Sequence, residues 1–163
     1  MKNRTWTNGD WEPKADILLS ELKASKEAYA TCIQADIYPQ KRPYFEKIYE
    51  QRAVFYTILR EEFNLLWHKE KDGSMTLPDP IFEPMERRIL EEKLTDRELD
   101  LLIVQKEQKL LDLYQKLLIY DWPNVTKAFL QSQAEQLNDE IYALQLDLAI
   151  KGENAVSKTA GSL

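Results

Sequence analysis

The positions of proline and glycine divide the chain into a few long, uninterrupted segments. Seven prolines and four glycines leave four stretches that contain neither residue: 14–38, 44–72, 85–122 and 124–151. Proline lacks a backbone donor and glycine loses much entropy when its backbone is fixed, so both avoid helix interiors. Each stretch therefore predicts a helix, and the scarcity of glycine argues against a turn-rich β fold.

The third stretch contains a second helix start. Thr95 is followed three residues later by Glu98, which is the spacing of a capping box. The sequence therefore predicts a short helix at about 81–93 and a new long helix from about residue 96.

Apolar residues recur at helical spacing in all four long segments. Members of the four apolar stripes include Leu18, Leu22 and Tyr29, then Ile48, Phe55 and Leu59, then Leu99, Ile103 and Tyr114, and finally Phe129, Leu137 and Leu144. Four long amphipathic helices predict an all-α four-helix bundle.

The connection lengths predict the topology. The first and second helices, and the third and fourth, are joined by short segments, which favours two antiparallel pairs. The middle joint, about 70–95, is much longer than the usual two to eight residues between bundle helices. We therefore expect a ferritin-like bundle with a long crossover containing the short helix, in preference to an up-down-up-down bundle with a folded flap. The expected divisions are a polar segment at 1–12, the bundle at 13–151 and a disordered tail at 152–163.

The charge balance limits the classes of partner. The formal net charge is −6, and no part of the chain carries the basic patch that nucleic-acid or anionic-membrane binding needs. The first residues lead into polar sequence and apolar runs are short, so we expect no signal peptide, no membrane span and a cytoplasmic location. Cys32 is the only cysteine, which excludes an internal disulfide and favours a core position.

Metal binding is disfavoured by the scarcity of histidine. Di-iron bundles use Glu-x-x-His motifs on two helices. The single histidine, His68, has Leu65 three residues before it, so no such motif exists. We therefore expect no standard di-iron site and no resident metal or cofactor.

One cation falls at the centre of an apolar stripe. Arg52 holds this position in the second helix. Glu107 lies near the stripe of the third helix and Glu140 near that of the fourth, where Gln133 precedes it on the same side of the helix. We predict a buried polar layer in which Arg52 pairs with Glu107, Glu140 or both, and in which Gln133 completes the hydrogen bonds. Such a layer can set helix register, line a ligand pocket or form part of a carboxylate metal site; the first reading is favoured.

Several of these residues also carry a family resemblance. The segments are Leu22-Lys23 with Tyr29, Glu50-Gln51-Arg52-Ala53-x-Phe55, Glu107 seven residues before Tyr114, and Gln133 with Leu137 and Ile141. Over about 15–150 the chain resembles an uncharacterised bacterial family of ferritin-like four-helix bundles of unknown function. The resemblance implies a ferritin-like fold and a dimer. Lys26 stands where such families usually have a Glu, which removes one potential metal ligand.

These observations favour a non-enzymatic bundle that acts through protein association, as a homodimer or with another protein. The candidate association patch consists of Trp6, Trp11, Trp67, Ile81, Phe82 and Trp122. The alternatives are a small-molecule-binding bundle that uses Arg52, and a metal protein or oxidase that uses carboxylates alone.

Overall fold

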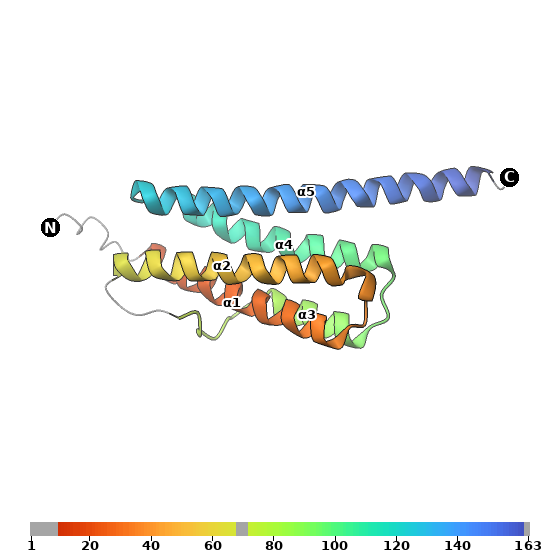
Figure 1. The fold of residues 1–163 in the computed structure, drawn as a ribbon. Coiled ribbons are helices and arrows are strands. Elements are labelled where there is room, and N and C mark those ends of the chain that lie inside the picture. The colour runs from red at the N-terminus through yellow and green to blue at the C-terminus, as the bar shows by residue number, and fades with distance from the viewer. Residues whose placement is uncertain (1–9, 68–71, 162–163) are drawn as a thin grey trace.

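The computed structural model describes residues 10–67 and 72–161, and all regular structure in this part of the chain is helical. The helices are α1 (Trp11–Ala35), the 3-10 turn η2 (Pro39–Lys41), α2 (Arg42–Trp67), α3 (Phe82–Glu91), α4 (Asp96–Leu118) and α5 (Asn124–Gly161). The predicted all-α class is confirmed. The four long helices lie side by side, and α3 packs beside α1 (Figure 1).

The helix boundaries differ from the predicted ones where proline or glycine was given too much weight. α1 begins at Trp11, ahead of Pro13, because a proline in the first turn lacks only a donor that would have no partner there. α5 continues through Gly152 to Gly161, ten residues past the expected end of the helix at 151. An interior glycine costs about 1 kcal/mol relative to alanine, which weakens a helix without ending it.

The capping box at the start of α4 is confirmed. The Thr95 hydroxyl accepts a hydrogen bond from the Glu98 backbone N–H at 3.1 Å, and the Glu98 carboxylate accepts one from the Thr95 N–H at 2.8 Å. Both donors belong to the group that a helix start leaves unpaired. This local motif separates α4 from α3.

Aromatic side chains close one end of the molecule. Trp11 at the start of α1 packs on Trp67 at the end of α2, with ring centroids 4.9 Å apart, and on Trp122 before α5, at 5.2 Å. Phe63 completes the cluster. The expectation that these tryptophans form an exposed association patch is therefore wrong, because their rings fill the space where three chain segments meet.

Two further members of the predicted patch are placed by the structure. Ile81 and Phe82, at the start of the short helix α3, are buried. Trp6 lies outside the described residues. None of the five described members of the predicted patch is therefore exposed.

The opposite end is held by Tyr38. Its hydroxyl donates to the Glu92 carbonyl at 3.0 Å and accepts from the Leu94 N–H at 2.9 Å, and nearby Gln40 donates to Asp96 at 2.7 Å. The chain thus leaves α2 at the aromatic end and begins α4 at the Tyr38 end. Consequently α4 runs in the same direction as α2, and α5 runs in the same direction as α1 (Figure 1).

The segment between α2 and α3 packs closely on α1. Gly73 has a positive φ of 73°, and a Cβ at this position would lie 2.9 Å from the Leu19 carbonyl oxygen. A larger residue would be pushed away from α1, so glycine is required here for two reasons.

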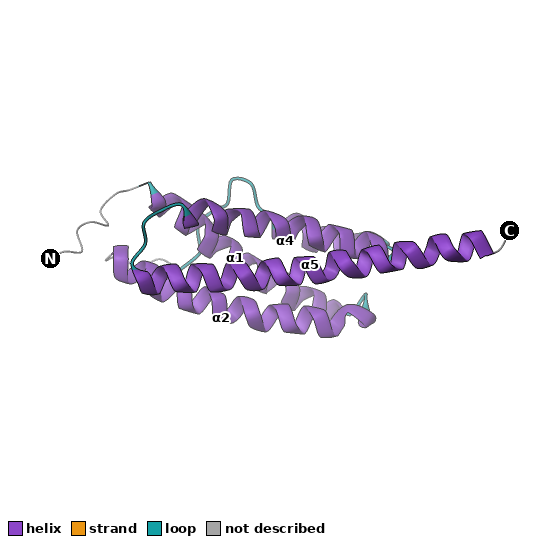
Figure 2. Ribbon diagram, turned by 90° about the horizontal axis from the view of Figure 1, so that it is seen from above, coloured by secondary structure: helices purple, strands orange, loops and turns teal. Residues whose placement is uncertain are grey.

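The helices differ in how many neighbours they have. α1 contacts α2, α3 and α4, whereas α5 contacts α4 and, less extensively, α2 (Figure 2). As a result residues 18–22 of α1 are all buried, which is more than a single amphipathic stripe provides. The seam between α2 and α5 is the more open side of the molecule.

Candidate functional site

An ion pair lies at the centre of the molecule. Arg52 on α2 and Glu107 on α4 are both buried, and their side chains are paired through Nη2 and Oε1, with Nη1 3.5 Å from Oε2. The predicted pairing of these two residues is therefore present. Because Arg52 is fully buried and paired, it offers no free charge to a ligand at the surface.

A tyrosine from a third helix completes the carboxylate's contacts. The Tyr29 hydroxyl on α1 donates to Oε2 of Glu107 at 2.7 Å. Burial raises the pKa of Glu107, while Arg52 and the Tyr29 hydrogen bond oppose that rise. Burial and the neighbouring Glu107 raise the pKa of Tyr29 well above its ordinary value, so the phenol remains a donor. The centre is thus a hydrogen-bonded ion pair shared by α1, α2 and α4.

Gln133 extends the polar layer without touching the ion pair. The Tyr114 hydroxyl on α4 donates to Oε1 of Gln133 on α5. Gln133 is buried, and its Nε2 has no hydrogen-bond partner. The prediction that Gln133 would complete the hydrogen bonds of this layer at Arg52 is wrong, because Gln133 instead forms a separate bond between α5 and α4.

Glu140 lies outside the layer. Its carboxylate accepts from Gln51 Nε2 at 2.9 Å and lies 3.6 Å from Lys47 Nζ, with 17% of the side chain exposed. Of the two acids predicted as alternative partners for Arg52, Glu140 does not pair with it, because α4 determines which side of α5 is buried. That side carries Ile141 and Leu144, and Glu140 is turned away toward α2.

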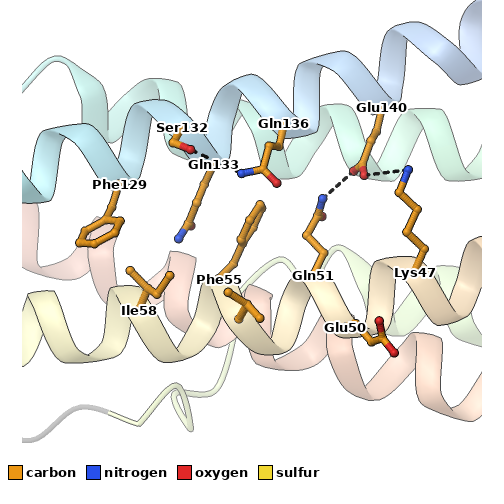
Figure 3. A pocket seen from close by; sticks show the side chains of 11 residues that line it. Lys47, Glu50, Gln51, Phe55, Ile58, Phe129, Ser132, Gln133, Gln136 and Glu140 are labelled. Atoms are coloured by element: carbon orange, nitrogen blue, oxygen red, sulfur yellow. Dashed lines mark hydrogen bonds and ion pairs between the residues drawn. The ribbon is translucent and has the colours of Figure 1, made fainter.

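Beside this layer, a pocket of about 470 Å³ lies between α2 and α5 (Figure 3). Its floor is apolar and includes Phe55 and Phe129, and its inner wall includes Gln133. The full lining is Lys47, Glu50, Gln51, Val54, Phe55, Ile58, Phe129, Ser132, Gln133, Gln136 and Glu140. Gln133 extends from α5 toward α2 with its amide nitrogen at the tip.

Sequence reasoning missed a buried acid on α1. Glu21 lies beneath the residues that lead into α3, where its Oε2 accepts from the Ile81 N–H at 3.0 Å and its Oε1 has no hydrogen-bond partner. Burial raises its pKa to about 7, the Ile81 hydrogen bond opposes the rise and nearby Asp79 adds to it. The spacing of Glu21 from Leu18 was an available signal, but a single-stripe reading of α1 placed no acid inside.

A second missed acid is Asp100 on α4. It is fully buried and pairs with Lys41 Nζ at 2.5 Å and Lys151 Nζ at 3.3 Å. These two ion pairs join η2, α4 and α5 at the Tyr38 end of the molecule. Its position directly after Leu99 and two residues before Leu102 was the signal that could have identified it.

The donor groups of the described residues give a metal no ready site. Within 10–67 and 72–161, no group of three or more His, Cys, Asp or Glu residues is arranged to hold an ion. Both oxygens of Glu107 are bonded to Arg52 or Tyr29. Cys32 is buried as expected, and burial raises the pKa of its thiol to about 12, so it is a core residue and a poor nucleophile.

The fold and this site define an all-helical protein whose centre is a buried ion pair and whose α2–α5 side carries a polar-walled pocket. No family model, no curated protein and no solved structure matches the chain. In the described residues, no helix combines the length and apolar character needed to cross a membrane.

Proposed function

We propose that this chain is a non-enzymatic, ferritin-like four-helix bundle that acts by protein association, and that it associates through α5. The direction of the helices supports the ferritin-like assignment. Two antiparallel pairs, α1 with α2 and α4 with α5, are joined by one long connection, which is the arrangement of ferritin-like bundles. The central ion pair then serves to fix helix register.

The length of α5 sets it apart from the other helices. Arg97 donates to the Leu148 carbonyl at 3.3 Å and Asp100 pairs with Lys151, so the first turn of α4 is level with 148–151 of α5. The last ten residues of α5 therefore extend beyond its neighbour (Figures 1 and 2). A helical segment without a packing partner is marginally stable in water, so this part of α5 gains most from a partner.

The observation that carries the proposal is an apolar stripe on the exposed side of α5. Tyr142, Leu146 and Ile150 are 63%, 48% and 50% exposed. Their four-residue spacing puts them on one face, opposite the buried side that carries Leu144 and Leu148. A stripe of this kind next to an unpartnered helix end is typical of an association surface.

We propose a second copy of this chain as the partner. A two-fold dimer pairs the same surface on both subunits, so the stripe of one α5 covers the stripe of the other. Antiparallel pairing would also place each overhanging segment against a neighbouring helix. No additional component is then needed to bury the surface.

Sedimentation analysis of the purified full chain tests this proposal. The wild type is expected to sediment at twice its 19.2 kDa mass. Leu146→Glu combined with Ile150→Glu should give monomers with unchanged helical content, since a charge in an apolar contact opposes association. Ile119→Glu, at an exposed position on the aromatic end, is the matched control and should remain dimeric. A monomeric wild type, or a dimer that survives the double substitution, would overturn the proposal.

A further inference from the structure

The pocket between α2 and α5 has features that self-association through the outer stripe of α5 does not use. Its volume of about 470 Å³ is in the range of small-molecule sites, and its floor includes Phe55, Ile58 and Phe129. An apolar floor that contains two aromatic rings suits a flat, apolar group. Polar groups then determine which molecule of that shape fits.

Two glutamines supply those polar groups, and each has one bonded and one unbonded end. Gln133 accepts from Tyr114 through Oε1, while its buried Nε2 has no partner. Gln51 donates to Glu140 through Nε2, while its buried Oε1 has no partner. A buried donor or acceptor without a partner costs about as much as a lost hydrogen bond, so both groups favour a molecule that supplies one.

The charges at the pocket indicate a neutral occupant. Lys47 and Glu140 lie on opposite sides of the mouth and pair with each other (Figure 3). Arg52, the nearest buried cation, is occupied by Glu107. Glu50, the third charged residue of the lining, turns its carboxylate away from the other lining side chains (Figure 3). The buried unbonded groups of the lining are thus one neutral donor and one neutral acceptor.

We propose that this pocket binds a neutral aromatic amide. The aromatic ring would lie on Phe55 and Phe129, the amide carbonyl would accept from Gln133 Nε2, and the amide N–H would donate to Gln51 Oε1. The ligand class is defined by this pairing: one acceptor and one donor held next to a flat apolar group. Gln133 is also held to α4, because its Oε1 accepts from the Tyr114 hydroxyl.

Acetanilide is a suitable probe because it contains one phenyl ring and one secondary amide. Titration of the ¹⁵N-labelled full chain should shift the side-chain amide signals of Gln133 and Gln51, with saturation and a dissociation constant on the order of 1 mM for a probe of this size. The ketone 1-phenyl-2-propanone replaces the N–H by CH₂. It should bind roughly 5-fold more weakly, through loss of one hydrogen bond.

Matched variants locate the binding. Ser132→Trp places a large side chain over the pocket from an exposed position and should abolish saturable binding. Glu135→Trp, at an exposed position on the same helix outside the pocket lining, should bind acetanilide as the wild type does. Circular dichroism checks that both variants keep their helical content.

Three results would overturn the proposal. The first is the absence of a saturable shift at the two glutamine side chains. The second is equal affinity of the wild type and Ser132→Trp for acetanilide. The third is a combined result, in which the wild type binds no acetanilide and the Ser132→Trp variant no longer self-associates. The pocket would then belong to an interface between two chains.

Discussion

Two buried glutamates illustrate how differently this molecule compensates a carboxyl group. Glu107 sits at the centre, where Arg52 and Tyr29 occupy both of its oxygens. Glu21 sits near the edge, beneath the connection to α3, where the Ile81 N–H is the hydrogen-bond donor and Oε1 has no partner. Both side chains are removed from water. Only the central one has a cation in contact.

The comparison shows that burial alone does not decide the behaviour of an acid. At the centre, an ion pair with an additional hydrogen bond links α1, α2 and α4, and breaking the ion pair leaves a buried charge. At the edge, burial without a contacting cation favours the protonated acid. The free energy of unfolding should therefore depend on the partners of Glu107 at the centre, and on pH through Glu21 at the edge.

The largest expected effect is at the centre. Arg52→Met should lower the free energy of unfolding by about 3–5 kcal/mol, because Glu107 is left buried without its cation. Urea denaturation followed by circular dichroism measures the loss. Combining Arg52→Met with Glu107→Leu should recover most of it, since no uncompensated charge remains. A double variant as unstable as the single one would show that packing, rather than charge, dominates here.

The next effect is pH dependence at the edge. The pKa of Glu21 is raised to about 7 in the folded chain, from 4.5 when unfolded. Below pH 4.5 the acid is protonated in both states. As the pH rises toward 7, the unfolded chain releases the proton first, so stability falls by roughly 3 kcal/mol relative to a chain without this group.

Glu21→Gln removes that titration while keeping an oxygen for the Ile81 N–H. Urea unfolding of both proteins between pH 4.5 and pH 7 should give similar stabilities at the lower pH and a more stable variant at the higher pH. The exposed Glu135→Gln is the control and should follow the wild type. If the stabilities of wild type and Glu21→Gln changed equally with pH, the contrast between the two glutamates would be removed.

The smallest of the three effects separates the hydrogen bond from the ion pair. Tyr29→Phe removes the hydroxyl that donates to Glu107 and leaves Arg52 in place. We expect a loss of about 2 kcal/mol, the usual range for a hydrogen bond to a charged group. Tyr49→Phe alters an exposed hydroxyl on α2, outside the proposed association stripe, and should change stability very little. Equal stability of Tyr29→Phe and wild type would mean that Arg52 alone compensates Glu107.

Local sequence features predicted much of the fold. The proline and glycine positions located the long helices to within a few residues, except at the end of α5, and the Thr95–Glu98 capping box located the start of α4. These signals depend on backbone geometry over one or two turns, so they operate without knowledge of the partner. A buried ion pair of Arg52 with Glu107, Glu140 or both was also predicted, because a cation at the centre of an apolar stripe requires an opposite charge.

The tertiary arrangement decided which sides of each helix meet. α1 is covered by three helices, so Glu21 is buried although one amphipathic stripe does not include it. α5 is oriented by α4, so Glu140 reaches the rim and Gln133 reaches the wall of a pocket. Trp11 and Trp122 close one end of the molecule, because segments distant in sequence meet there. Periodicity gives the apolar side of a helix, whereas the number and position of its neighbours determine which polar groups are buried with it.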